Sequence, residues 1–536
     1  MQKVLTAKID GRSMGDSEII DAILESRGIE DLDSILRPTE DDLIPFEKLK
    51  NIDKAYEIID DGITMGDKFL VLADTDVDGV SAGAIMTRYL MKAGADVDVT
   101  INEGKEHGLE TFDVSMLEDY DIFIVVDSIN NNPEIYRNVT NMGCQLIILD
   151  HHIPSKELLE SDVPFVLVSS AVDYENPELS GAGVVMKMCL YLDEMNLTDH
   201  ADDLYWLAAV GITGDMCSVS SPENRYIISK GLMQYKDPVV KKLLGTYMFN
   251  TEAVSFSIAP LINAANRVNR NNIALDTFLA NDEESINEFY PQLKACREEQ
   301  NAIVDSMMPS LTEQIEAQLD KKFMVFHIDN TDVNITGLLG NKILAEVQRP
   351  LVVVKDCGDK WMGSMRAIGV SDFMKMVNDS NLAKCDGHEL AAGFECDKDK
   401  FDEFCNVMEE ELKDIEFTTD VTADIEINID QINDGLIKQF GTLNKISGKG
   451  HEPITVLVRT NDYTVSTFSS KKHLKIIDNE TGVILVKWND MSWQTMNNDK
   501  EFIGIGKISS AYYGRNKFTQ VVLDEYTQQN DCEVDI

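Results

Sequence analysis

Acidic and imidazole side chains stand directly after apolar runs at four places in the sequence. The apolar runs have the length and composition of buried strands or helices, and the polar residues begin where each run stops. These residues are Asp74, Asp76 and Asp78 after Phe69–Ala73, Asp127 after Ile122–Val126, Asp150, His151 and His152 after Leu146–Leu149, and Asp215 in the segment after the predicted helix Leu204–Val210.

This placement predicts a metal centre. If the runs are parallel strands of one open sheet, ligands bind outside their shared carboxyl ends. Carboxylates gathered there without partners would repel one another and raise one another's pKa values. Bound divalent cations remove that repulsion, and carboxylates with imidazole suit Mn²⁺ and tolerate Mg²⁺. Two such ions can clamp both oxygens of an in-line displacement at phosphorus.

Each group of residues also has a simpler interpretation. A single aspartate after a strand is more often a helix cap or a turn residue. The alternating aspartates 74, 76 and 78 could form a solvated loop in so acidic a chain, and the two adjacent histidines could be structural. Four such groups in one predicted domain favour the metal centre over these separate explanations.

The elements that would position these residues follow a β-α-β pattern. Apolar runs at 69–73, 122–126, 146–149 and 165–168 alternate with predicted helices, including Gly183–Met195. Continuous apolar runs suit strands that are buried on both faces of a parallel sheet. The pattern predicts a doubly wound α/β domain over residues 51–250, preceded by a polar N-terminal segment at 1–50.

Three further parts are predicted after this domain. Residues 251–320 form connecting helices, with helices at Asp282–Gln300 and Asn301–Leu319. A smaller α/β domain covers residues 321–418. The short strands and turns of residues 419–536 are typical of a β-barrel of the OB type.

The composition restricts the class of protein in two ways. Nine cysteines without C-x-x-C pairs fit a reducing compartment, and no secretory signal or membrane-spanning run is present, so we expect a cytoplasmic protein. The net charge of −46 is unusual for a nucleic-acid binder. Binding depends on a local patch, however, and bound cations reverse the field of a carboxylate cluster. We have no physical account of the remaining excess charge.

The motifs around these residues resemble those of the RecJ branch of the DHH phosphoesterase superfamily. The four catalytic motifs of that superfamily correspond to A-D-T-D-V-D-G at 73–79, V-V-D-S at 125–128, L-D-H-H at 149–152 and G-I-T-G-D-M at 211–216. Further matches are N-P-E-L-S-G-A-G at 176–183, P-L-I-N-A-A-N-R at 260–267, G-S-M-R at 363–366 and D-G-H-E-L-A-A-G at 386–393. The ordered set is specific, and the similarity runs from about residue 36 to the C-terminus.

The resemblance implies an enzyme that uses two Mn²⁺ or Mg²⁺ ions to degrade single-stranded DNA from the 5′ end and release 5′-mononucleotides. It also implies roles in DNA repair and recombination. By motif, the metal ligands are Asp76, Asp78, Asp127, His151 and Asp215, with Asp127 bridging and Asp74 at the edge of the site. The catalytic set is Asp127, His151, His152 and Asp215. Substrate phosphates would be held by His152, Arg267, Ser364, Arg366, Gly387 and His388.

Three departures from the family pattern stand out. The second motif reads D-S-I-N at 127–130 where the family usually has D-N-G, and Asp386 replaces the first glycine of the glycine–histidine motif. The basic segment usual after the first motif is shortened around Asn102–Leu109. We expect these changes to alter rate or substrate preference more than the chemistry. The length and the charge are consistent with a divergent, phage-encoded member.

The predicted C-terminal barrel carries basic residues interleaved with aromatic ones, which is typical of single-strand binding. These are Lys471, Lys472, Lys475, Lys487, Arg515 and Lys517, with Phe468, Trp488, Trp493, Tyr512, Tyr513 and Phe518. The alternative is that many of these aromatic side chains belong to the barrel core.

Two other functions remain open at this point. One is a phosphodiesterase of the same superfamily that acts on short oligonucleotides or cyclic dinucleotides. The other is a non-catalytic replication scaffold, although every ligand position is retained. A helicase or a single-strand-binding protein is the partner that we expect for a monomeric chain.

Overall fold

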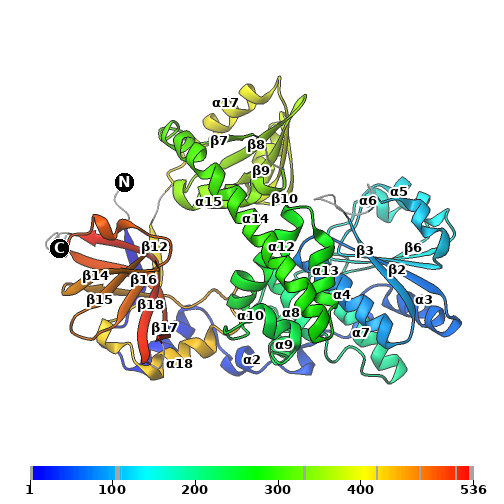
Figure 1. The fold of residues 1–536 in the computed structure, drawn as a ribbon, viewed down its shortest axis with the longest axis horizontal. Helices are drawn as coiled ribbons and strands as arrows, with labels where there is room; N and C mark the ends of the chain where they lie inside the picture. The colour runs from blue at the N-terminus through cyan, green and yellow to red at the C-terminus, as the bar shows by residue number, and fades with distance from the viewer. Residues whose placement is uncertain are drawn as a thin grey trace. The chain divides into compact units, whose positions relative to one another are not determined.

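The computed structural model describes residues 4–102, 109, 112–329, 333–417, 420–469, 472–513 and 516–529. The chain divides into two compact units, drawn in Figure 1. One unit is Thr39–Phe417, and the other joins Met1–Pro38 to Thr418–Ile536. Among the described residues, no helix combines the length and the apolar character needed to cross a membrane.

A parallel five-stranded sheet forms the first half of the larger unit. Its strand order is β3 (Asp96–Ile101), β2 (Lys68–Ala73), β4 (Ile122–Val126), β5 (Gln145–Asp150) and β6 (Phe165–Ser169). The chain runs outward from β2 to β3 and then returns to β4 on the other side of β2. Ligands bind where the strand order reverses in this way, so the binding crevice is expected at the carboxyl ends of β2 and β4.

Both faces of this sheet are buried, which confirms the predicted doubly wound arrangement. Leu70, Phe123 and Ile148 contribute to one apolar cluster beneath α5 and η3, while Phe69 and Ile122 point to the opposite face and are fully buried. The elements around the sheet are η1 (Glu40–Asp42), η2 (Phe46–Lys48), α3 (Ile52–Met65), α4 (Val77–Lys92), η3 (Val114–Asp119), α5 (Pro133–Thr140), α6 (Lys156–Leu159), α7 (Gly181–Asn196) and α8 (Tyr205–Gly214).

A helical region follows the sheet. It consists of α9 (Pro222–Leu232), α10 (Pro238–Leu244), α11 (Thr251–Ala253), the π-helical turn η4 (Val254–Ile258), α12 (Ala259–Arg267), α13 (Asn271–Leu279) and α14 (Glu283–Glu316). The sequence predicted two helices with a break at Gln300, and this prediction is wrong because α14 is one helix of 34 residues. Cys296, Gln300 and Val304 are buried at helical spacing, so the packed stripe continues through the polar residue.

The second sheet of this unit is mixed. Its order is β10 (Ala383–His388), β11 (Ala391–Asp397), β9 (Lys360–Arg366), β8 (Leu351–Cys357) and β7 (Met324–Ile328), and only β7 and β8 run parallel. The helices here are η5 (Val333–Ile335), α15 (Thr336–Val347), α16 (Phe373–Asp379) and α17 (Phe401–Glu411). The predicted α/β character of this region is confirmed by β7, α15 and β8, and the antiparallel strands β9 to β11 carry the G-S-M-R and D-G-H-E motifs.

The smaller unit contains an eight-stranded sheet in the order β1-β12-β13-β17-β18-β16-β15-β14. Its elements are β1 (Leu5–Asp10), α1 (Asp16–Ser26), α2 (Leu32–Leu36), β12 (Val421–Glu426), η6 (Ile429–Gln431), α18 (Asp434–Leu443), β13 (Val456–Thr460), β14 (Tyr463–Phe468), β15 (His473–Asp478), β16 (Ile484–Lys487), η7 (Ser492–Gln494), β17 (Glu501–Tyr513) and β18 (Asn516–Gln529). Most of these strands are short, as predicted, but β17 has 13 residues and β18 has 14.

The N-terminal residues are part of this sheet and do not form the separate segment that was predicted for residues 1–50. Strand β1 pairs in parallel with β12, Leu5 opposite Val421 and Ile9 opposite Ile425. Ile19 and Ile23 of α1 enter the same apolar cluster as Phe440 of α18. A pairing across more than 400 residues leaves no local pattern in the sequence, because β1 alone is a short alternating run.

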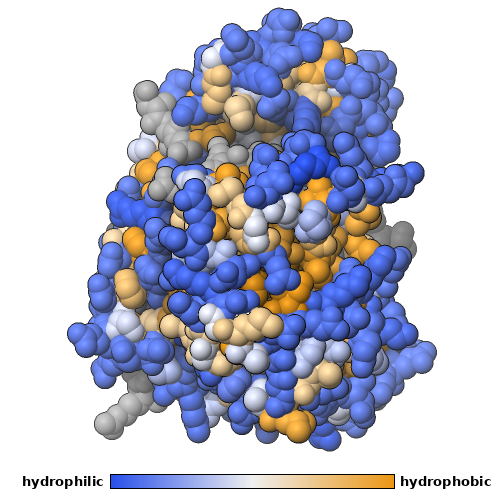
Figure 2. Space-filling view, turned by 90° about the vertical axis from the view of Figure 1, so that its right-hand side faces the viewer, coloured by the Kyte–Doolittle hydropathy of each residue, from blue (hydrophilic) through white to orange (hydrophobic). Residues whose placement is uncertain are grey.

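The surface is strongly polar, as the charge predicts. The face in Figure 2 is mostly hydrophilic, with apolar side chains gathered in its central part. Charged residues make up 26% of the chain, and acidic residues outnumber basic ones, 94 to 48.

The N-terminal helix is tied to the C-terminal strands by a mostly buried ion pair. Arg27 Nη2 donates to Asp424 Oδ2 at 2.7 Å, and Thr455 N donates to the same oxygen at 3.0 Å. Burial raises the pKa of Asp424, but the hydrogen bond and the charge of Arg27 outweigh burial and leave the pKa below its ordinary value.

We predict that Asp424→Asn lowers the unfolding free energy by about 3–5 kcal/mol near neutral pH, since removing one partner leaves Arg27 buried and unpaired. Because the folded pKa of Asp424 lies below its unfolded value, its contribution is full above the unfolded value and is lost as the pH falls through the folded one. Scanning calorimetry at several pH values should show a smaller loss of stability on acidification in this variant. The exposed Asp430→Asn variant is the control, and equal pH dependence in both variants would contradict the prediction.

Candidate metal centre

The first motif leaves the sheet at the end of β2 and starts a helix at once. Asp76 is the N-cap of α4, and its Oδ1 accepts hydrogen bonds from Asp78 N at 2.9 Å and Gly79 N at 3.0 Å. Asp74 is 2% exposed, and its Oδ1 accepts from Ser128 Oγ at 3.3 Å. A Cβ on Gly79 would lie 2.5 Å from the Asp74 Cβ, so only glycine lets α4 start this close to the strand. The interpretation of Asp76 as a helix cap is therefore correct. Both capping hydrogen bonds go to Oδ1.

Asp78 is fully buried and is bound at the N-terminus of α7. It accepts hydrogen bonds from Ser180 Oγ at 2.8 Å, Gly181 N at 2.7 Å and Ala182 N at 3.2 Å. The positive end of a helix dipole stabilises a carboxylate in this position. Burial and then the charge of Asp215 nevertheless raise the pKa of Asp78 well above its ordinary value.

The loop before α7 is fixed by a buried polar network. Lys187 of α7 and Glu223 of α9 form an ion pair at 2.5 Å, and both side chains are almost completely buried. Glu223 also accepts from Asn176 Nδ2 at 3.0 Å, at the start of the N-P-E-L-S-G-A-G motif. The motif is therefore held rigidly where its last residues meet Asp78.

Asp127 stands at the end of β4 in a strained conformation. Its φ is +56°, which is uncommon for a residue other than glycine. The side chain is 2% exposed, and its Oδ1 accepts no hydrogen bond from any described residue. Burial raises the pKa of Asp127 well above its ordinary value, and the charges of Asp78 and Asp76 raise it further. A buried carboxylate oxygen without a donor is costly, and a bound cation would satisfy it.

The aspartate of the D-H-H motif has a different role from its neighbours. Asp150 is fully buried and accepts from Ile129 N, from His151 N at 2.5 Å, and from His152 N at 3.1 Å and its Nδ1 at 2.8 Å. Burial raises the pKa of Asp150, but its bonds to His152 outweigh burial and lower it. Asp150 thus supports the two histidines, and it also belongs to one group of possible metal-binding side chains, with Asp127, His151 and His152.

The surroundings of the two histidines favour a neutral ring at His151 and a charged ring at His152. Burial lowers the pKa of His151, which keeps its ring neutral, the form that binds metals. The pKa of His152 rises to about 9, because the hydrogen bond and charge of Asp150 outweigh burial. The His152 side chain is 54% exposed, so a charged ring faces outward beside the carboxylates.

Three groups of these side chains could hold a metal ion, and a group of Asp127, Asp150, His151 and His152 overlaps the other two. Oxygens of Asp74, Asp76 and Asp127 lie within 4.8 Å of one another. On the other side, His151 Nε2 lies 3.2 Å from Asp127 Oδ1, 3.7 Å from Asp215 Oδ2 and 3.9 Å from Asp78 Oδ2. The oxygen and nitrogen donors, together with the unpaired Asp127 Oδ1, fit two divalent cations with Asp127 between them. We call these the Asp74 subsite and the His151 subsite.

The comparisons with known proteins agree with this geometry. Residues 68–212 match the family model described as the DHH family, N-terminal domain. The chain carries a DHH-family domain. The chain is 28% identical over 492 residues to a putative SPbeta prophage-derived single-strand DNA-specific exonuclease, YorK, of Bacillus subtilis. The alignment covers 83% of this chain and 84% of that protein.

RecJ of Thermus thermophilus is similar to this chain both in sequence and in structure. The single-stranded-DNA-specific exonuclease RecJ is 29% identical over 370 residues, which are 66% of this chain and 54% of the relative. The crystal structure of RecJ in complex with Mn²⁺ superimposes with a TM-score of 0.79 at 22% identity, covering 99% of this chain and 80% of that chain. The RecJ-like fold that the sequence motifs implied is confirmed.

The side chains implied for phosphate binding lie beside the DHH domain and on the second sheet. Arg267 ends α12 and donates from Nη1 to Gln300 Oε1 at 3.0 Å. Burial, together with the charges of Arg297 and Arg366, lowers its pKa to about 10. Guanidinium groups bind phosphate through paired hydrogen bonds, so Arg297 joins Arg267 and Arg366 as a candidate phosphate-binding residue. The sequence pattern did not single out Arg297, because it lies in the middle of a charged helix with no motif around it.

The G-S-M-R and D-G-H-E motifs lie on β9 and at the end of β10. Ser364 is buried and lies 2.9 Å from Thr336 Oγ1, while Arg366 donates to Asn341 Oδ1 at 2.6 Å. Gly387 has a φ of +138°, which favours glycine, and His388 follows it at the end of β10. The charge of His388 is one of the causes that lower the pKa of His151, after burial and the charge of His152. Asp386, the departure from the family motif, pairs with Gly393 and is exposed.

Of the aromatic side chains predicted to bind DNA in the smaller unit, some are exposed and one packs against the core. Trp493 packs against the core, as the alternative interpretation proposed, whereas Trp488 is 52% exposed and forms a ring cluster with Phe468 and His473. Tyr512 is 70% exposed, and Phe518 is 36% exposed. Lys471, Arg515, most of the Asn102–Leu109 segment and the side chain of Tyr513 lie outside the described residues.

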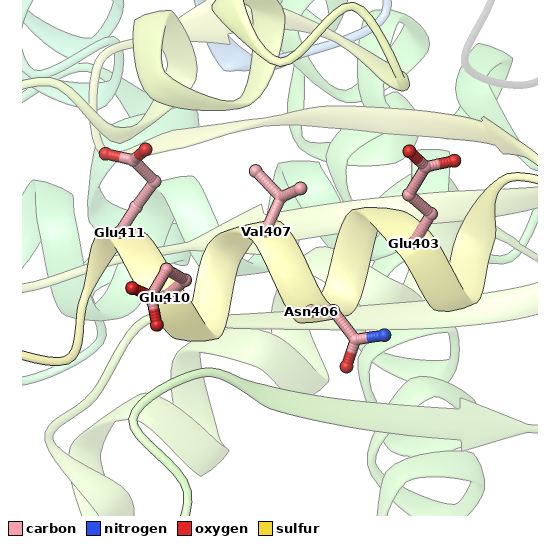
Figure 3. A pocket seen from close by; sticks show the side chains of 5 residues that line it. All are labelled: Glu403, Asn406, Val407, Glu410 and Glu411. Atoms are coloured by element: carbon pink, nitrogen blue, oxygen red, sulfur yellow. The ribbon is translucent and has the colours of Figure 1, made fainter.

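A hollow on α17 is also lined by acidic side chains, so it can be compared with the metal centre. Glu403, Asn406, Val407, Glu410 and Glu411 line it along a single helix (Figure 3). Every group of metal-binding side chains found among the described residues includes Asp127 or His151, and none includes these glutamates. Acidic charge alone therefore does not mark the site.

We predict that Asp127→Asn abolishes binding of both cations, because Asp127 belongs to both subsites, whereas Asp74→Asn abolishes only one. Calorimetric titration of the metal-free protein with Mn²⁺ measures the stoichiometry. The Asp127→Asn protein without metal should unfold at the same or a higher temperature than wild type, since a buried, unpaired carboxylate is removed. Retention of one tight Mn²⁺ in Asp127→Asn would show that this residue is not shared.

Proposed function

We propose that this chain hydrolyses phosphodiester bonds in single-stranded DNA with two divalent cations, Mn²⁺ or Mg²⁺. The observation that carries the proposal is the pair of subsites that share Asp127. Two-metal sites of this kind serve phosphoryl transfer, and the relatives named above are single-strand-specific exonucleases. We further propose that digestion runs from the 5′ end and releases 5′-mononucleotides.

The chain's own residues would divide the work as follows. Asp74, Asp76 and Asp127 hold one cation, and Asp78, Asp127, His151 and Asp215 hold the other. When bound, the cations would supply a water of lowered pKa and would neutralise charge on the phosphate. His152, kept charged by Asp150, donates to the scissile phosphate. Arg267, Arg366, Ser364, Gly387 and His388 hold neighbouring phosphates, and no covalent intermediate with the protein is needed.

The proposed division of labour extends to the remaining parts of the chain. Residues 51–250 act as the catalytic domain, residues 251–320 connect it to a substrate-binding domain at 321–418, and residues 419–536 act as an OB-type domain that holds the strand. The exposed Trp488 cluster supports the last assignment, because bases stack on such rings. We also propose that the chain is a cytoplasmic monomer that works with a helicase or a single-strand-binding protein. The free cysteines among the described residues support the cytoplasmic location.

The alternative within the superfamily is a phosphodiesterase for short oligonucleotides or cyclic dinucleotides. The eight-stranded sheet argues against it, because a dinucleotide does not need a second binding unit. A scaffold without catalysis is opposed by the strained and unpaired Asp127, which has no structural benefit.

We predict rapid Mn²⁺-dependent degradation of a 5′-phosphorylated single strand and slow degradation of the matching blunt duplex. Strands labelled at either end identify the direction of digestion, and a dinucleotide substrate tests the alternative function. The Asp127→Asn protein is the inactive control. Equal rates on single strand and duplex, or faster turnover of the dinucleotide, would overturn the proposal.

We predict that Arg366→Gln weakens binding of single-stranded DNA and lowers the slope of log K against log salt by about 0.7, the value for one phosphate contact on a single strand. Binding is measured by fluorescence anisotropy in the Asp127→Asn background, so that the strand is not cut. Lys375→Gln, which removes an exposed lysine paired with Asp379, is the matched control. An unchanged salt slope for Arg366→Gln would remove this residue from the phosphate-binding set.

A further inference from the structure

A cysteine lies beside the His151 subsite, and the proposed hydrolysis does not use it. Cys217 is 6% exposed, and its thiol donates to Asp215 Oδ2 at 3.2 Å. Neither the metal motifs of the sequence nor the roles assigned above include this residue. Mn²⁺ and Mg²⁺ prefer oxygen ligands, so a thiol adds nothing to a centre built for those ions alone.

The end of α8 brings Cys217 back toward the centre. Helix α8 ends at Gly214, and Met216 adopts a left-handed conformation with a φ of +57°. Met216 N then donates to Thr213 O at 3.3 Å, and Cys217 N donates to Ile212 O at 3.2 Å. This pair of bonds is a Schellman ending, which reverses the chain direction. Asp215 and Cys217 consequently reach the same side while the Met216 side chain points to solvent, 73% exposed.

The donor atoms around Cys217 form a set of mixed chemistry. His151 Nε2, a carboxylate oxygen of Asp215 and Cys217 Sγ lie within 4.8 Å of one another. Asp127 Oδ1, which is buried and accepts no hydrogen bond, lies 3.2 Å from the same His151 nitrogen. The group itself supplies one nitrogen, one sulfur and one oxygen, and Asp127 Oδ1 beside His151 offers a fourth donor, the number that zinc takes in closed tetrahedral sites.

We propose that the His151 subsite is also a site for thiophilic divalent cations, in which Cys217, His151, Asp215 and Asp127 bind Zn²⁺ or Cd²⁺ and exclude the catalytic ion. The inference rests on the proposed function only for its consequence, which is inhibition. As the ion binds, the S–H bond breaks, the proton passes to solvent and the sulfur lone pair forms the bond to the metal. No oxidation or reduction takes place.

The consequence follows from ligand number and ligand type. A catalytic metal site keeps an open position for water, whereas four protein ligands close it. Zinc also binds nitrogen, oxygen and sulfur sites more tightly than Mn²⁺ does. Low concentrations of Zn²⁺ should therefore stop Mn²⁺-dependent hydrolysis, and Cys217 should set the zinc concentration at which this happens.

The test uses the full-length, metal-free chain with Cd²⁺ alone as the probe, because cadmium–thiolate bonds absorb in the ultraviolet. Wild type and the control Cys357→Ser, which removes an exposed cysteine on β8, should show this absorption with the first equivalent of Cd²⁺. Cys217→Ser and Cys217→Ala should lose it and bind Cd²⁺ about 100-fold more weakly, because even partners outside the ligand set change metal affinity by roughly 10–100-fold. The same absorption and affinity in both Cys217 variants would overturn the proposal.

A second measurement needs no variant at position 217. Excess Mn²⁺ should displace Cd²⁺ from wild type and remove the absorption, because both ions share His151, Asp215 and Asp127. An absorption that Mn²⁺ leaves unchanged would place the thiolate site elsewhere and contradict the proposal, even if the Cys217 variants failed to fold.

The nuclease assay separates this inference from the proposed function. If wild type degrades no DNA with Mn²⁺, the proposed function fails, while the Cd²⁺ titration still decides the role of Cys217. If wild type is active, Zn²⁺ should inhibit it and the Cys357→Ser control alike. Cys217→Ser, compared with its own zinc-free rate, should require about 100-fold more zinc, in line with the loss of one ligand. Equal inhibition of all three proteins would contradict the inference.

Discussion

The repulsion between buried carboxylates is the constraint on which the rest of the catalytic half depends. Asp78 and Asp127 have almost no exposed surface, and the charge of Asp78 raises the cost of ionising Asp127. Separating such charges would relieve the repulsion, but β2 and β4 are neighbours in the sheet, and their last residues cannot move apart. Only hydrogen-bond donors or cations can offset that energy, since the interior around them has a low dielectric constant.

The protein satisfies some of these carboxylates itself and leaves others for a ligand. The N-terminus of α7 supplies three donors to Asp78, while the D-H-H loop supplies three to Asp150 and Ile129 N supplies a fourth. Asp127 accepts none at Oδ1 and keeps a strained backbone. The centre is therefore organised in advance for cations, because the donors fix the surrounding groups while the shared oxygen stays open. The same arrangement would also let a thiophilic cation bind in place of the catalytic ion, because Cys217 lies beside the open position.

The acidic composition and the proposed DNA substrate are compatible for the same reason. Net charge is a sum over the whole surface, whereas a strand meets a local field. Burial lowers the pKa of Arg267 to about 10 together with the charges of Arg297 and Arg366, so positive charge is gathered around this residue. Cations at the carboxylates would add further positive charge. The acidic side chains of α17, by contrast, stay exposed and belong to no metal-binding group among the described residues.

The sequence by itself determined the sheet and the carboxylates at its edge, because buried parallel strands need continuous apolar runs and the polar residues that follow them lie at one rim. Local patterns could not show which oxygen is left unpaired, since that depends on donors from α7 and the D-H-H loop that meet only in the folded chain. They also missed the pairing of β1 with β12, the continuity of α14 through Gln300, and Arg297 and Cys217 beside the site. Those features arise from contacts between distant segments and from chain reversals such as the one at Met216, so only the tertiary structure decided them.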